Sequence, residues 1–271
     1  MTNYVLIPRV LGARFDVPLS RAWMNGCVHS SAVINGFSLI FPVGEEMLMV
    51  TLAEVTPLLA NAKLQKQVAM FLLQEGSHRL EHRRYNQALA LCGLTLADPI
   101  ATFHRLLPAS AQQAPLVRRL AACAALEHFT AIFSACVQEQ FARLCPNDTA
   151  YRRFWMWHTL EELEHRHLTL DVYRALGGGY WQRCLMLLAL TLPFWIDTLR
   201  CIRAAAVARD MSRWQTALAV WKVLNPINGL SRSAVRRYLA WFKPGFRFDE
   251  PAFDGLMRHT DEHYGFTRRA Y

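Results

Sequence analysis

Two Glu-x-x-His sequences, each set in an apolar stripe of helical period, limit how this 271-residue chain can fold. The first holds Glu75 and His78, and the second holds Glu162 and His165. On a helix, residues three and four apart share a face. Along the first segment that face continues through the apolar residues Leu64, Val68, Phe71, Tyr85 and Leu89. The ionisable groups are therefore expected to point into a core, where a charge is costly unless a partner or a metal ion balances it.

Helical periodicity also dominates the rest of the chain, and alternating strand-like runs are almost absent. Proline and glycine positions separate four long helices from a region of shorter ones. The long helices are expected at about 30–59 (bent near Pro42), 62–91, 114–144 and 149–176, with a loop at 94–113 and two or three further helices at 180–242. Four long helices with ordinary connections predict an all-α fold built on a four-helix bundle, with additional C-terminal helices.

This pattern divides the chain into three parts: an N-terminal arm at 1–28, a metal-binding bundle at 29–178 and a C-terminal helical extension at 179–271. The extension contains a hydrophobic segment, 184–196, that is too short to span a bilayer by itself. Two interpretations of this segment stay open. It is either a buried helix kinked at Pro193, or a helix that rests in a membrane interface or lines an entrance for apolar substrates.

Composition narrows the classes of partner. The formal charge is +9, but the basic residues are spread over many segments and no nucleic-acid-binding motif accompanies them, so no nucleic-acid partner is predicted. The seven cysteines show no Cys-x-x-Cys spacing and the N-terminus resembles no signal peptide. These features predict a cytoplasmic protein with unpaired thiols. Peripheral contact with a membrane and formation of a homodimer stay open.

Two inward-facing helices that each carry Glu-x-x-His match the pattern of di-iron carboxylate bundles, which also requires one glutamate from each of the other two helices. The third helix offers Glu127, and the first offers Glu45 or Glu46. Glu45 is preferred because it continues the apolar stripe of the first helix. His158 lies one turn before Glu162 and is either a further ligand or a histidine that holds a carboxylate ligand. The predicted metal ligands are Glu45, Glu75, His78, Glu127, His158, Glu162 and His165.

Other ionisable residues near these positions are assigned different roles. His82 and Glu161 are expected to hydrogen-bond to the ligands rather than bind the metal. His128 and His167 lie off the ligand faces and are expected to be structural. The alternative to a metal site is a buried ion-pair network in which arginines neutralise the glutamates. Candidates for that network are Arg83, Arg84 and Arg166.

Several of these stretches together resemble a known family. FPVGE, QEGSHRLEHRRYN, LEHFTA and WHTLEELEHRH are similar to the motifs of the bacterial "predicted metal-dependent hydrolase" family of ferritin-like proteins. The resemblance runs from about Arg9 through the fourth helix and, more loosely, through 184–196. The ligand order with His158 added is also similar to that of the di-iron arylamine N-oxygenases, whose ligands would fall on the same seven positions. The chain departs from those enzymes by adding His82 and a hydrophobic C-terminal part. The resemblance implies a ferritin-like bundle.

Four carboxylates with two or three imidazoles suit iron or manganese, and their charge balances two divalent ions. The leading expectation is a di-iron enzyme that uses O2 as a co-substrate to oxidise or oxygenate a small or lipid-like organic molecule, with an electron donor that the sequence does not identify. One alternative is two-metal hydrolysis of an ester or phosphoester. Another is a non-catalytic protein that handles iron.

Overall fold

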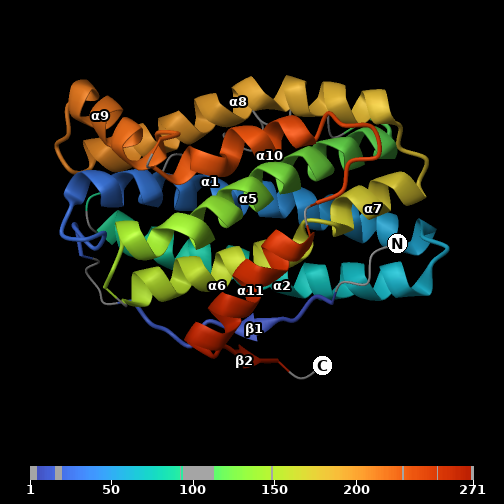
Figure 1. Ribbon diagram of the computed structural model, residues 1–271, viewed down its shortest axis with the longest axis horizontal. Coiled ribbons are helices and arrows are strands. Elements are labelled where there is room, and N and C mark those ends of the chain that lie inside the picture. Colours follow the sequence, from blue (N-terminus) through green and yellow to red (C-terminus); the bar gives the residue numbers. More distant parts are fainter. Residues whose placement is uncertain are drawn as a thin grey trace.

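The computed structural model describes residues 5–15, 20–91, 93, 113–147, 149–227, 229–248 and 250–269, and nearly all of its regular structure is helical (Figure 1). The strands in these residues are β1 (Arg9–Val10) and β2 (Thr267–Arg268), which pair antiparallel. The predicted all-α fold is therefore confirmed. The predicted N-terminal arm contains β1, because the C-terminal strand supplies its hydrogen-bond partners.

The long helices of the bundle begin and end close to their predicted positions. They are α1 (Val28–Val55), which continues as the 3-10 helix η1 (Thr56–Leu58), α2 (Ala62–Leu91) and α5 (Leu116–Leu144). Pro42 lies inside α1, as expected. The loop predicted at 94–113 lies outside the described residues, apart from Gln113.

The fourth predicted helix differs from the prediction, because it is divided into α6 (Ala150–His165) and α7 (Leu168–Ala175). The interruption falls at Arg166 and His167. The Arg166 side chain donates to the carbonyl of Leu163 and, at 2.8 Å, to the carboxylate of Asp254. When a side chain donates a hydrogen bond to a carbonyl of the last helical turn, it replaces a backbone hydrogen bond of the helix. The local sequence does not show this contact.

The C-terminal helices are packed directly on the bundle. They are α8 (Tyr180–Val207), α9 (Arg213–Leu224), η2 (Leu230–Ser233), α10 (Ala234–Ala240) and α11 (Glu250–Tyr264). Figure 1 shows α8 along one edge of the molecule, where it packs on α1 and α5. The contact with α1 is close: a Cβ added at Gly36 would lie 2.5 Å from the Cα of Ile202. Glycine at this position therefore permits the two backbones to approach.

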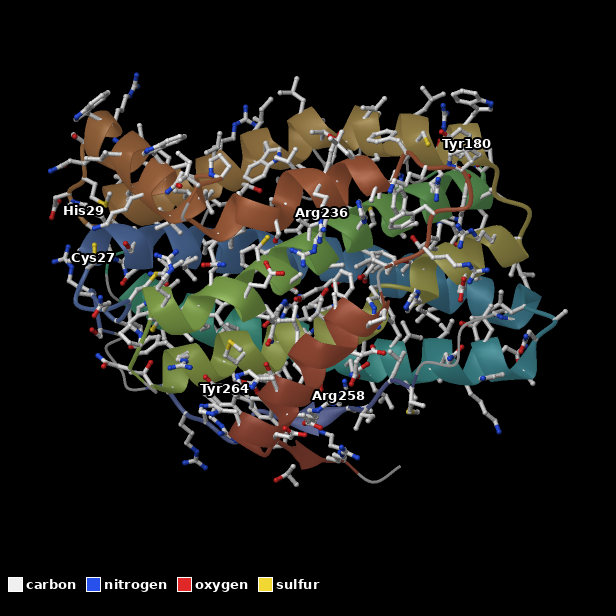
Figure 2. The ribbon with its side chains drawn as sticks, viewed as in Figure 1. Cys27, His29, Tyr180, Arg236, Arg258 and Tyr264 are labelled. Carbon is white, nitrogen blue, oxygen red and sulfur yellow. The ribbon has the colours of Figure 1, made fainter. Side chains whose placement is uncertain are left out.

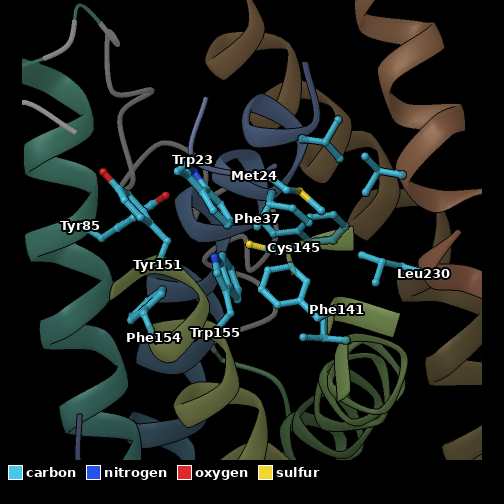
Figure 3. Packing of buried hydrophobic residues seen from close by; sticks show 14 of the residues in the cluster. Trp23, Met24, Phe37, Tyr85, Phe141, Cys145, Tyr151, Phe154, Trp155 and Leu230 are labelled. Atoms are coloured by element: carbon cyan, nitrogen blue, oxygen red, sulfur yellow. The ribbon is translucent and has the colours of Figure 1, made fainter. Parts of the chain in front are cut away.

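Two apolar clusters fill the bundle, one toward each end. The first contains Trp23, Tyr85, Phe141 and Trp155, which Figure 3 shows packed around the start of α6. The second is built from the opposite halves of the same long helices and includes Leu52, Leu64, Phe71, Leu120 and Leu163. Glu45, Glu75, His78 and Glu162 lie along their helices between residues of the two clusters, and the other predicted ligands lie beside one cluster or the other. A polar layer held between two apolar layers is shielded from water on both sides.

Three helical stretches in the described residues are long and apolar enough to cross a membrane, judged by length and composition alone. Two of them, Val28–Leu58 and Leu116–Leu144, are 72% and 83% buried within the protein over their most apolar windows. The third, Tyr180–Val207, is only 28% buried. The first two are therefore core helices of the bundle, whereas the third presents apolar surface outward.

Candidate metal centre

The structure brings all seven predicted ligands together at the centre of the bundle. Glu45 comes from α1, Glu75 and His78 from α2, Glu127 from α5, and His158, Glu162 and His165 from α6. All seven are buried, with at most 3% of each residue exposed. Their donor atoms form overlapping groups in which the atoms of a group all lie within 4.8 Å of one another. This is the spacing needed for several side chains to reach one ion.

One group consists of Glu75, Glu127, Glu162 and His165. His165 Nδ1 lies 2.9 Å from Glu75 Oε1 and 3.8 Å from Glu162 Oε1. Glu127 Oε1 lies 3.9 Å from the same nitrogen. Three carboxylates and one imidazole from three different helices thus face one point.

Neighbouring groups join Glu75 with Glu45 and His78, and Glu162 with His78 and His158. Glu162 Oε1 lies 3.2 Å from His78 Nδ1 and 3.6 Å from His158 Nε2. Glu75 and Glu162 each belong to two of these groups, as do Glu45, His78 and His158. The candidate donor atoms therefore form several overlapping groups rather than a single one.

Glu161 fixes the orientation of the His78 ring. His78 Nε2 lies 3.0 Å from Glu161 Oε2, while the other carboxylate oxygen of Glu161 accepts the backbone N–H of Arg9 at 2.5 Å. His78 Nε2 therefore holds its proton toward Glu161, which leaves Nδ1 directed at Glu162. Glu161 contacts the predicted ligand His78 in the manner expected from the sequence.

His165 is oriented by a chain of partners that the sequence did not reveal. Its Nε2 donates to Gln74 Oε1 at 3.1 Å, and Gln74 Nε2 donates to Glu164 Oε2 at 2.9 Å. Glu164 is in turn paired with the buried guanidinium of Arg9 at 2.8 Å. Because Gln74 presents its oxygen to the ring, His165 Nδ1 is the nitrogen left for a metal. Gln74 directly precedes Glu75 in the sequence, but no repeated spacing of glutamines indicated that Gln74 would contact His165.

A third chain orients His158. Asn86 donates its side-chain N–H to the Ser38 carbonyl, and its Oδ1 accepts the Ser38 hydroxyl at 2.8 Å. The Ser38 oxygen is then free to accept the N–H at Nδ1 of His82, 2.8 Å away. His82 Nε2 therefore accepts from His158 Nδ1 at 3.2 Å, and His158 Nε2 faces the carboxylates. His82 supports His158, although the donor atoms of Glu45, His82 and His158 are also close enough to share an ion.

The surroundings of the cluster shift the pKa values of its carboxyl and imidazole groups in different directions. Burial raises the pKa of Glu45 and Glu127 well above the usual range, and the neighbouring carboxylates raise it further. Burial opposes ionisation of Glu162 as well, but its contact with His78 and the nearby imidazoles lower its pKa to about 2. His78 is the converse case, since contacts with Glu161 and Glu162 raise its pKa well above the usual range against the effect of burial. Burial lowers the pKa of His158 well below its usual value.

Unpartnered polar atoms show that these residues suit metal ions. Among the described residues, buried atoms without a hydrogen-bond partner include both carboxylate oxygens of Glu45 and of Glu75. The same holds for one donor atom on each other predicted ligand: His78 Nδ1, Glu127 Oε1, His158 Nε2, Glu162 Oε2 and His165 Nδ1. A buried polar atom without a partner costs about 1–3 kcal/mol, so such a set in one place is explained by a ligand that the atoms are arranged to hold.

The arginines of the ion-pair alternative are engaged with other acids. Arg84 pairs with Glu81 at 2.6 Å, Arg83 lies 3.9 Å from Glu46, and Arg166 pairs with Asp254. Glu46, the alternative to Glu45, forms a surface ion pair with Arg79. His128 stacks on Trp241 and His167 packs edge-on against Phe248, outside the groups of candidate donor atoms in the described chain.

Three of the predicted ligands also line a small apolar cavity of about 60 Å³. Glu45, Glu75 and Glu162 form its polar end, and the rest of its wall comes mainly from apolar side chains of α1, α5 and α8. Gly44 lies in this wall, and a Cβ added to it would meet no atom within 4 Å. Leu190 and Phe194 form the α8 side. The cavity has room for a few water molecules or the reacting end of an apolar molecule.

Gln74→Leu is expected to weaken metal binding about 10- to 100-fold, because the His165 ring loses the oxygen that fixes its tautomer and orientation. Gln74 is fully buried, whereas Gln87 on the same helix is exposed, so Gln87→Leu is the matched control and should bind metal as the wild type does. Metal affinity is measured by competition with a chromophoric chelator. Equal affinity in the two variants would show that Gln74 does not position His165.

The fold and the site define an all-α protein whose buried glutamates and histidines are able to hold metal ions. Residues 8–250 match the family described as "Predicted metal-dependent hydrolase", and the chain belongs to that family. No curated protein and no solved structure matches the chain. The relation to ferritin-like proteins and to the arylamine N-oxygenases stays a prediction, as does the assignment of each residue as a ligand.

Proposed function

We propose that this protein is a two-metal hydrolase that cleaves an ester or phosphoester carrying an apolar group. The observation that carries the proposal is the set of unpartnered carboxylate and imidazole atoms at the end of an apolar cavity. Family membership supports metal-dependent hydrolysis. When bound, two divalent ions would polarise the carbonyl or phosphoryl oxygen and lower the pKa of a water nucleophile.

The chain's own residues have distinct parts in this proposal. Glu75 and Glu162 would help to hold the metal ions, because each belongs to two of the groups of candidate donor atoms. Thr130 lines the cavity and places its hydroxyl 3.3 Å from Glu127 Oε2, which limits the rotation of that carboxylate. Leu48, Leu190 and Phe194 would bind the apolar group and keep bulk water from the reacting bond.

A second candidate is the O2-dependent oxidation of an organic substrate. One observation favours it: the convergent donors are glutamates and histidines in paired Glu-x-x-His register, the set found in di-iron carboxylate bundles. Such a donor set suits iron or manganese. The two candidates use the same residues and differ in whether turnover consumes O2.

The test loads separate samples of the purified protein with iron, manganese and zinc, and measures metal content, ester and phosphoester cleavage, and O2 uptake. Cleavage that needs metal and proceeds without O2 supports the hydrolase. O2 uptake by the reduced iron form, with no cleavage under nitrogen, replaces the hydrolase with the oxidase. Metal binding with neither cleavage nor O2 uptake would contradict both enzymatic proposals and favour a non-catalytic protein that handles iron.

A cavity-filling variant links cleavage to this site. Gly44→Leu adds a side chain to open space in the cavity wall and should lower kcat/KM more for long-chain than for short-chain esters. Gly255→Leu on α11 is the matched control, because it is also a helical glycine with open space around it but lies outside the cavity wall. The same chain-length profile in both variants would place substrate binding elsewhere.

A further inference from the structure

The outward side of α8 is an apolar stripe. Six of its residues, spaced alternately four and three apart, are between 37% and 74% exposed: Trp181, Leu185, Leu188, Leu192, Trp195 and Leu199. The opposite side of the helix, including Leu187 and Ile202, is buried. In Figure 2 the side chains on the outer edge of α8 extend away from the bundle, from the N-terminal residue Tyr180 onward. The packing of α8 on the bundle leaves this stripe uncovered.

Helix α9 adds a second set of exposed apolar residues at helical spacing. Trp214, Leu218 and Trp221 are between 56% and 77% exposed. Figure 1 shows α9 beside the C-terminal end of α8, at the same edge of the molecule. We call the six residues of α8 and these three residues the α8–α9 face. Large exposed apolar patches on soluble proteins mark contact with a partner or a membrane.

Charge is concentrated in the same region of the chain. Residues 180–245 contain ten lysines and arginines but only two acidic residues, Asp197 and Asp210, which gives a formal charge of +8. The whole chain carries +9, so the other residues are close to neutral. Part of this charge does not reach the surface, because Arg183 and Arg209 are buried. Asp197 pairs with Arg200 at 3.0 Å, and Arg237 pairs with Glu139. Arg213 and Lys222, both on α9, are exposed.

We propose that the α8–α9 face binds the surface of an anionic lipid bilayer. Four tryptophans and five leucines beside a positive field match the two attractions that hold a helix in a membrane interface, apolar burial and attraction to anionic headgroups. A second copy of this chain fits the face less well, because pairing would bring two regions of formal charge +8 together.

The face lies on the bilayer rather than across it. The inner side of α8 packs on α1 and α5, and it buries Arg183 and Asp197 within the protein. Only one side of the helix is therefore available to lipid. The stripe would enter the interface to the depth of its side chains, with the helix axis parallel to the surface.

Docking in this orientation connects the bilayer to the cavity. Leu190 and Phe194, which line the cavity, lie on the helix that carries the stripe. The cavity wall would thus be held at the lipid surface. If the proposed function holds, the substrate class is an ester or phosphoester that resides in the membrane. This extension rests on the proposed function, whereas binding of the face to lipid does not.

The test is flotation of the full-length protein with two kinds of vesicle: phosphatidylcholine alone, and phosphatidylcholine mixed with phosphatidylglycerol. Binding is expected to be stronger to the anionic vesicles and to fall as salt rises. The variant Leu185→Gln/Leu188→Gln/Leu192→Gln should lower the partition coefficient by more than about tenfold. A matched control removes apolar residues of similar exposure on α1 and α2: Val50→Gln/Leu80→Gln/Leu91→Gln.

A charge variant tests the electrostatic part. Arg213→Gln/Lys222→Gln, both exposed on α9, should weaken binding to anionic vesicles roughly tenfold. Lys66→Gln/Arg118→Gln removes two exposed charges from other helices and should leave binding unchanged.

Several results would overturn the proposal. These are absence of flotation, equal loss in the apolar variant and its control, and equal binding to neutral and anionic vesicles. A wild-type dimer that fails to float, and that the leucine variant converts to a monomer in analytical ultracentrifugation, would assign the face to a second copy. These measurements do not depend on enzymatic turnover, so they test membrane binding separately from the proposed hydrolase activity.

Discussion

Glu162→Ala is expected to remove at least one of the two metal ions and to lower activity by more than about 100-fold, since residues that only support a ligand already account for 10- to 100-fold. Glu162 belongs to two of the groups of candidate donor atoms. Its carboxylate lies within 3.8 Å of the site-facing nitrogens of His78, His158 and His165. Among the described residues, no other carboxylate lies this close to three of the imidazoles. Metal content is measured by elemental analysis of the folded variant.

Glu46→Ala is the control for this variant. Glu46 follows Glu45 in the sequence but pairs with Arg79 on the surface, where an ion pair contributes little to stability. It should retain both ions and full activity. Circular dichroism of Glu162→Ala should retain the helical spectrum, because the two apolar clusters on either side of the site are untouched. Unchanged metal content in folded Glu162→Ala would remove this residue from the site.

Metal affinity is expected to rise steeply with pH, by up to about 100-fold per pH unit. In the metal-free protein the raised pKa values of Glu45 and Glu127 favour the protonated form of both carboxyl groups, and metal binding displaces these protons. Each proton released contributes up to about tenfold per pH unit. Titration with metal at a series of pH values, in buffers of different ionisation enthalpy, measures both the affinity and the protons released.

The same groups give the metal-free protein a stability that falls as pH rises. The pKa of each of these carboxyl groups is higher in the folded protein than its ordinary value near 4.5 in the unfolded chain. At a pH above 4.5 the folded protein therefore binds more protons than the unfolded chain, and the free energy of unfolding falls as pH rises. The raised pKa of His78 acts in the same direction above its ordinary value near 6.5. The lowered pKa values of His82 and His158 act oppositely, but only below that value. The free energy of unfolding should therefore fall as pH rises above about 6.5.

Denaturant unfolding with and without metal measures this effect. Saturation with metal at 1,000 times its dissociation constant adds about 4 kcal/mol to the free energy of unfolding. The gain from metal should widen with pH. The variant Glu45→Gln/Glu127→Gln, which cannot ionise at these positions, should flatten the pH dependence of the metal-free protein. A slope unchanged in that variant would mean that other groups titrate.

The convergence of the predicted ligands could be predicted because their positions follow a helical period. Glu75 with His78 and Glu162 with His165 repeat one spacing on two apolar faces, and a bundle must turn such faces inward. The bounds of α1, α2 and α5 followed from proline and glycine positions in the same way. The interruption of the fourth helix could not be predicted in this way. At that point Arg166 contacts Asp254, which lies on α11 far along the chain.

The sequence alone determined that the chain is helical and that its glutamates and histidines share inward faces, because both depend on residues a few positions apart. Only the tertiary structure decided what surrounds those ligands. Arg9, Gln74 and Ser38 reach the site from separate segments and have no spacing in common. The tertiary structure also decided which of the apolar helices is exposed at the surface. The three apolar stretches have mean hydropathies of 1.4, 1.6 and 1.6, yet two are core and the third is largely exposed, because burial depends on the neighbours that pack against a helix and not on its composition.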